Sequence, residues 1–478
     1  MDAEIEWIGR CFAQIENIKR QTIVNLFMKY SIYYISVALL YSVIFFCNCN
    51  IKFDLFYTLI SICIYVTSNV FYFCRRKSII NFEFFFCLAF FVASFLVYFI
   101  TEIGEGFALF VFSSNQSSLV KGIALAMIGY HCYLCGLLSI KQINKHINDG
   151  IEYMPRMNIC SAKIANCMCL LAFFLFLYMD GINLLGRYKG DSGGGNLYLE
   201  GLSYWVITYS VAVYASFSSA KFCGSKSIIY NLFCLNKLFL VNSVIIISLL
   251  LISGYRSQVM QVVIPVLICY NVFVKRLSSR SFLLILTGGL VLMIVVGMTR
   301  SGDQLEKEYS LISYLKDFNP ANGALGFFIE EVDHNGITGG SNYMPQTLGI
   351  IPYLQSLVGA FVDFNSFASP SSRVYTRAFD TESGMGTHIV GDIYYSFGFI
   401  GVILIMFMLG KFCRWLSISR SKYAFLMYIV LTGNSVFAVR VELLYAVRML
   451  AWSCFLLYLI NMLSKSSSNY KLKIVKKC

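Results

Sequence analysis

The sequence predicts an all-α polytopic membrane protein with about twelve transmembrane helices, one long outer loop and one shorter one. Of its 478 residues, 58% are hydrophobic and only 13% are charged, which is more apolar surface than a water-soluble core can hide. Apolar windows of membrane-spanning length recur along the chain, and lysines and arginines gather in alternate connections. That alternation is typical of multi-pass helical proteins.

Residues 1–29 predict a cytoplasmic amphipathic segment. Ile5, Ile8, Phe12 and Ile15 recur at helical spacing among charged residues, a pattern of helices that lie in the membrane interface. An ordinary cytosolic tail is the alternative. The segment lacks the basic, apolar and small-residue order of a cleavable signal peptide, so we expect none.

Twelve apolar windows follow, each about as long as a bilayer requires. They are 30–47, 53–74, 79–100, 120–140, 164–180, 202–219, 238–253, 258–274, 281–298, 391–410, 423–439 and 441–463. We therefore divide the chain into a bundle of about nine spans (30–298), a long loop (299–390), three final spans (391–463) and a basic tail (464–478).

The positive charges predict the orientation. An even number of spans puts both termini on one side, and most of the 38 lysines and arginines then fall in connections on that side. The termini are therefore expected in the cytoplasm, with loops 181–201 and 299–390 outside. The net charge of +13 reflects this topology and contact with anionic lipid heads; no nucleic-acid footprint is met.

The 17 cysteines indicate neither disulfides nor a metal site. Most lie inside apolar windows, where cysteine behaves as a small hydrophobe. Cys132 and Cys135 have CxxC spacing, but no second pair lies near them. We expect no metal and no cofactor.

The long loop, 299–390, is the best candidate for a working site. It holds four of the chain's six prolines (Pro320, Pro345, Pro352 and Pro370) together with apolar runs, so order is expected over disorder. Its end carries charged residues and one histidine: Arg373, Arg377, Asp380, Glu382 and His388. The shorter loop contains a glycine-rich run after Arg187, which is either a mobile anion-binding lid or a solvated flexible loop.

Four arginines lie at the ends of apolar windows on the expected outer side: Arg256, Arg300, Arg440 and Arg448. A guanidinium at membrane depth costs about 2.5 to 3.5 kcal/mol, so such residues usually face a cavity or snorkel to the interface. Several arginines converging on one cavity suit a pyrophosphate, since each offers a planar fork to phosphate oxygens.

We assign pyrophosphate binding first to Arg256, Arg373 and Arg377, with Arg187, Arg300 and Arg448 as further candidates. A glycosyl transfer also needs a group that takes a proton from the attacking hydroxyl. The candidates for that group are His388, Asp380, Glu382 and Asp392, and spacing alone singles out none of them.

These features resemble the Wzy-type O-antigen polymerases of Gram-negative bacteria. Arg373 and Gly384 enclose ten residues, which fits the R-x10-G pattern of that family. The segment from Gly384 to Val402, a loop that runs into a span through Asp392, Phe397–Gly398 and Gly401, is also similar. The shorter loop departs from the pattern, because no glycine stands eleven residues after Arg187.

The resemblance implies a metal-independent glycosyltransferase of the bacterial inner membrane. Such an enzyme joins undecaprenyl-pyrophosphate-linked oligosaccharide repeat units at the periplasmic face, so both loops would be periplasmic. Membrane lipid, a chain-length regulator and a flippase are the implied partners. The alternatives are a lipid-linked oligosaccharide flippase, against which the lack of an internal repeat argues, an O-antigen ligase, and a non-catalytic partner of the export machinery.

Overall fold

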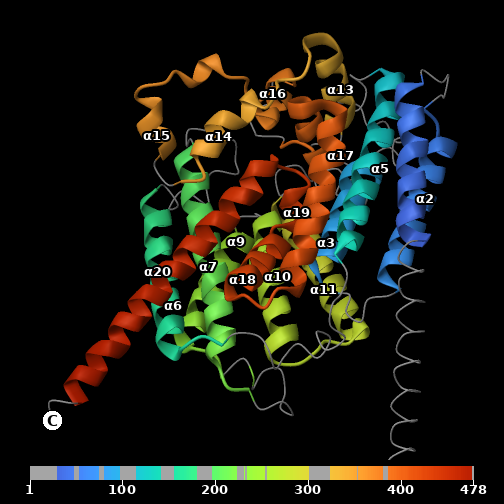
Figure 1. The fold of residues 1–478 in the computed structure, drawn as a ribbon. Coiled ribbons are helices and arrows are strands. Elements are labelled where there is room, and N and C mark those ends of the chain that lie inside the picture. Colours follow the sequence, from blue (N-terminus) through green and yellow to red (C-terminus); the bar gives the residue numbers. More distant parts are fainter. Residues whose placement is uncertain are drawn as a thin grey trace, which may run out of the picture.

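The computed structural model describes residues 29–47, 53–74, 80–96, 115–140, 156–179, 196–222, 231, 234–252, 256–300, 323–351, 354–379 and 386–475. No β-strand occurs within these ranges. The long helices stand side by side as a bundle, and a layer of short helices covers one end of it (Figure 1). The predictions for segment 1–28 and for Arg187 lie outside the described residues.

The helices of the bundle agree with the apolar windows. They are Lys29–Phe46, α2 (Leu55–Phe73), α3 (Phe82–Phe91) with the π-helical turn Val92–Leu96, α5 (Gln116–Ser139), α6 (Ile159–Tyr178), α7 (Asn196–Ser219), α9 (Lys237–Ile252), α10 (Arg256–Phe273), α11 (Ser279–Arg300), α17 (Ile389–Ile418), α18 (Lys422–Gly433), α19 (Ser435–Ala438) and α20 (Leu443–Val475). Each of the twelve windows overlaps one or two of these helical segments.

Six of these helices are long and apolar enough to cross a membrane: Lys29–Phe46, α2, α5, α6, α17 and the Leu443–Lys465 part of α20. Four shorter apolar helices are Phe82–Leu96, Lys237–Leu251, Gln258–Phe273 and Lys422–Gly433. The described residues therefore form a multi-pass helical membrane protein. The total of twelve spans and the side on which each loop lies stay predictions.

The described part of the long loop folds into a loop layer. It consists of α13 (Ala324–Asn335), the 3-10 turn Ser341–Tyr343, α14 (Met344–Leu348), α15 (Leu354–Gly359), the 3-10 turn Phe364–Ser366 and α16 (Ser371–Ala378). A small apolar cluster joins α13 and α16 to the start of α17, formed by Ala324, Phe328, Tyr375 and Tyr395. The loop layer thus has its own core against the bundle.

Among the described helices, α5 and α17 share the most extensive contact, and glycines allow their close approach. A Cβ added at Gly136 would collide with the carbonyl oxygen of Phe407, and one at Gly410 with that of Tyr133. Small residues of this kind let two membrane helices approach backbone to backbone.

Helix α17 is broken at Gly398, whose φ of 68° and ψ of −163° are not helical. Because the helix breaks here, carbonyl groups of the preceding turn cannot accept hydrogen bonds from the N–H groups four residues later. The amide N–H groups of Thr338 and Gly340 donate to the carbonyls of Tyr395 and Ser396, each at 3.0 Å. The first part of α17, residues 389–397, is thereby tied to the loop layer.

Candidate functional site

A single buried carboxylate connects three elements at the loop end of the bundle. Asp392 is fully buried in the first part of α17. It accepts hydrogen bonds from Tyr343 Oη at 2.5 Å, from Ser371 Oγ at 2.6 Å and from the backbone N–H of Leu443 at 3.0 Å. Asp392 therefore fixes the positions of the loop layer and of the start of α20 relative to α17.

The tyrosine of this junction is held as a donor. Burial first, and the nearby Asp392 carboxylate second, raise the pKa of Tyr343 far above its ordinary value. Its hydroxyl therefore stays protonated and donates a hydrogen bond to a carboxylate oxygen of Asp392. Together with the other two bonds, this satisfies the buried carboxylate, which would otherwise be costly to bury.

A second carboxylate holds the start of α16. Glu442, which directly precedes α20, accepts from both the backbone N–H of Ser372, at 3.2 Å, and the hydroxyl of Ser372. Negative groups at a helix N-terminus accept hydrogen bonds from its unpaired N–H groups and interact favourably with the helix dipole. Asp392 and Glu442 thus anchor α16 by its first two residues.

The anchored helix presents two arginines. Tyr375 of α16 is fully buried, whereas Arg373 and Arg377 are exposed. These arginines are four residues apart, so they are neighbours on one helix face. No hydrogen bond or ion pair to another described residue holds either guanidinium group. The described part of the chain therefore does not engage either guanidinium group.

The predicted histidine lies inside the fold. His388 is 1% exposed, and its Nδ1 accepts from the backbone N–H of Val390 at 3.2 Å. The proton therefore sits on Nε2, which lies 2.9 Å from Ser94 Oγ and donates to it. Burial lowers the pKa of His388 to about 3, so the imidazole is neutral at physiological pH and caps α17.

Backbone pairing explains one glycine of the Gly384–Val402 segment. The N–H groups of Thr387 and Ile389 donate to the carbonyls of Arg440 and Val439, both at 2.9 Å. At Gly386 the chain has a φ of 77°, and a Cβ there would lie 2.7 Å from the carbonyl oxygen of Arg440. Only glycine fits this conformation and this space.

A third arginine lies beneath the loop layer on α20. The guanidinium of half-buried Arg448 sits 5.3 Å from the centre of the Tyr445 ring. A Cβ added at Gly349 would lie 3.9 Å from Arg448 Nη1. One turn further along α20, Trp452 Nε1 donates to the carbonyl of Ile350 at 2.6 Å. The turn between α14 and α15 therefore rests directly on Arg448 and Trp452.

The side chains of the remaining predicted site residues lie outside the described part of the structure. Arg256 is the first residue of α10 and Arg300 the last of α11, but their side chains lie outside the described part. Asp380, Glu382 and Gly384 lie outside the described residues altogether. A shared cavity for Arg256, Arg373 and Arg377 stays a prediction.

Sequence reasoning missed the anchors of the site. Tyr343, Ser371 and Glu442 act through partners 49, 21 and 70 residues away along the chain. No local spacing rule reports such pairs. Within the described residues, no group of three or more His, Cys, Asp or Glu side chains could hold a metal ion.

The fold and site define a multi-pass helical membrane protein whose loop layer presents cationic side chains at one end of the bundle. A family model described as O-antigen polysaccharide polymerase Wzy matches residues 30–473, nearly the whole chain, and the chain belongs to that family. No curated protein and no solved structure matches it significantly.

Proposed function

We propose that the protein is the polymerase that joins undecaprenyl-pyrophosphate-linked O-antigen repeat units at the periplasmic face of the inner membrane, with both termini in the cytoplasm. The observation that carries this proposal is the pair Arg373 and Arg377, exposed on a helix that two carboxylates anchor. Membership of the Wzy family supplies the reaction class.

The reaction is a displacement at an anomeric carbon. A hydroxyl of the incoming repeat unit forms the new glycosidic bond, and the bond from the growing chain's anomeric carbon to its lipid pyrophosphate breaks. The leaving pyrophosphate gains charge as that bond breaks. Arg373 and Arg377 stabilise this charge, because each guanidinium can donate two parallel hydrogen bonds to phosphate oxygens.

The proton of the attacking hydroxyl needs an acceptor. His388 and Asp392 already use their polar atoms within the fold, so we assign them positioning roles. Asp380 and Glu382, which follow α16 in the sequence, are the proposed proton acceptors. No metal or other cofactor takes part in this scheme, and a chain-length regulator and a flippase are its proposed partners.

Complementation of a polymerase-deletion strain tests the proposal. Arg373→Ala should abolish the lipopolysaccharide ladder and leave a single repeat, whereas Arg373→Lys should leave only short chains, because lysine keeps the charge but loses the fork. The matched control is Arg280→Ala, an exposed arginine of α11, which should give a normal ladder.

A normal ladder from Arg373→Ala at matched membrane levels would contradict the role of Arg373. Loss of all repeats, including the single one, in the deletion strain itself would point to a ligase or a flippase instead.

A further inference from the structure

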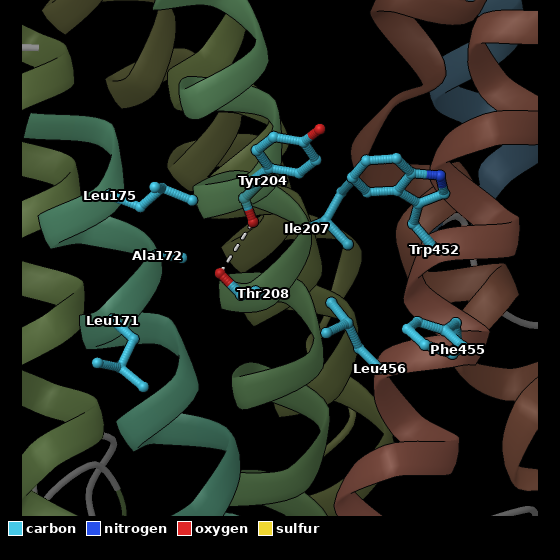
Figure 2. A pocket seen from close by; sticks show the side chains of 9 residues that line it. All are labelled: Leu171, Ala172, Leu175, Tyr204, Ile207, Thr208, Trp452, Phe455 and Leu456. Carbon is cyan, nitrogen blue, oxygen red and sulfur yellow. Dashed lines mark hydrogen bonds between the residues drawn. The ribbon is translucent and has the colours of Figure 1, made fainter. Parts of the chain in front are cut away.

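The bundle has an apolar groove beside Arg448 to which the proposed chemistry assigns no role. Its volume is about 280 Å³, and three helices line it (Figure 2). The lining residues are Leu171, Ala172 and Leu175 of α6, Tyr204, Ile207 and Thr208 of α7, and Trp452, Phe455 and Leu456 of α20.

The groove opens on the side of the bundle. Leu171 is 67% exposed, Phe455 53% and Leu175 44%. Both α6 and α20 are long and apolar enough to cross a membrane, so this opening faces the hydrocarbon of the bilayer. A chain can therefore enter the groove sideways from the lipid.

Polar atoms of the lining are engaged by the protein itself. Thr208 Oγ1 donates to backbone carbonyls of the preceding turn, at 2.9 Å from that of Tyr204 (Figure 2). Trp452 Nε1 is bonded to Ile350 of the loop layer. The groove therefore offers a guest mainly apolar contact, which favours a hydrocarbon over a sugar.

Two stacked aromatic rings line the groove, and a cation lies next to one of them on α20. The rings of Tyr204 and Trp452 stack with centroids 4.5 Å apart and planes at 13°. Arg448 precedes Trp452 by four residues on α20 and is therefore its neighbour toward the loop layer. An apolar groove that leads to a guanidinium fits an amphiphile with an anionic head.

We propose that this groove binds the isoprenoid chain of the incoming unit's lipid pyrophosphate next to its head, with the head at Arg448, while Arg373 and Arg377 hold the leaving pyrophosphate of the growing chain. The identity of the lipid rests on the proposed function. The volume of about 280 Å³ lies just below the range of about 300 to 1,000 Å³ for ligand pockets, so the groove holds only part of a hydrocarbon chain. Binding here would hold the pyrophosphate under the turn between α14 and α15.

Photolabelling of the full-length protein tests this assignment. The probe is sugar-free undecaprenyl pyrophosphate with a diazirine on its first isoprene unit, in vesicles of phosphatidylethanolamine and phosphatidylglycerol. The label is expected on lining residues of α6, α7 and α20. Excess undecaprenyl pyrophosphate should compete for it, and added phosphatidylglycerol should not.

Two leucines of similar exposure provide a matched pair of variants. Leu175→Trp fills the mouth of the groove and should reduce labelling about tenfold. Leu404→Trp, at a position of α17 that is 52% exposed, adds the same ring elsewhere on the bundle and should leave labelling unchanged. Ala172→Phe fills the groove from within and should act like Leu175→Trp.

Normal labelling of both groove variants would overturn the inference, as would equal competition by phosphatidylglycerol, which would indicate an ordinary lipid site. The probe carries no sugar, so labelling does not require polymerisation. If labelling follows expectation while Arg373→Ala keeps its ladder, the proposed arginine role fails and the groove stands. If Arg373→Ala loses its ladder while both groove variants are labelled normally, the arginine role stands and only the groove assignment fails.

Discussion

Helix α17 is held by different forces on the two sides of Gly398. Beyond the break, glycine contacts let its backbone lie against α5. Before the break, residues 389–397 are held by hydrogen bonds from the loop layer and from α20, centred on Asp392. The first interface depends on volume and the second on matched donors and acceptors.

This difference separates the folding of the bundle from the placement of the site. An extra atom disrupts a close-packed interface, whereas the loss of a charge does not affect it. A buried polar junction is sensitive in the opposite way, because an unsatisfied donor is costly. The arginines of α16 depend on the polar junction, so a change there should affect function before it affects insertion.

The largest expected effect is at the packed interface. Gly136→Ala places a methyl group against the backbone of α17, where neither the Phe407 carbonyl nor the Lys411 nitrogen, 2.9 Å from that Cβ, can move aside cheaply. We expect a loss of about 3 kcal/mol of stability, seen as a lower unfolding midpoint in detergent and less protein in membranes.

The control for that change is Gly288→Ala on α11, where an added Cβ meets no atom within 4 Å. It should leave both measurements unchanged. Equal midpoints for the two variants would show that the α5–α17 backbones are not in the contact described.

A smaller effect is expected at the polar junction. Asp392→Asn replaces one acceptor oxygen by an NH₂ group that faces the donors Tyr343, Ser371 and Leu443. We expect a loss of about 2 kcal/mol, together with shortened polymer, because α16 loses one of its anchors.

Asp333→Asn, at an exposed carboxylate of α13 whose surface ion pair with Lys121 is 3.7 Å long, serves as the comparison and should change unfolding little and chain length not at all. Wild-type stability in Asp392→Asn would mean that the three hydrogen bonds are not made.

The smallest effect concerns pH and His388. The pKa of this group falls from 6.5 to about 3 on folding, so the folded state resists a proton that the unfolded state accepts. The stability that the neutral His388 contributes is therefore fully present above pH 6.5 and is lost as the pH falls toward 3. Between pH 7.5 and 5.5 the loss should be about 1.4 kcal/mol.

His388→Asn keeps a side chain that can cap α17 but cannot titrate, so its unfolding midpoint should depend less on pH over the same interval. An identical pH dependence in both proteins would place His388 in contact with water.

The apolar windows could be found from the sequence because the membrane imposes a local rule. Each crossing helix must be apolar over its own length, and that property is readable without knowing any neighbour. Arg373 and Arg377 could be selected because they are charged residues of a long polar loop, although the helix α16 that places them on one face was not predicted. Gly386 lay within the segment that was singled out, although its steric role was not foreseen.

Other features exist only because distant segments meet. The sequence gives no sign that Glu442 meets Ser372, or that Tyr343 meets Asp392, since each pair is created by folding of the loop layer onto α17 and α20. His388 looks like a loop residue in the sequence, but its pairing with the chain at Val439 and Arg440 buries it. The sequence determined which segments are apolar and which side chains carry charge, because these are properties of single residues. The tertiary structure decided which charges are buried and which remain free, because burial and hydrogen bonding depend on partners far away in the chain.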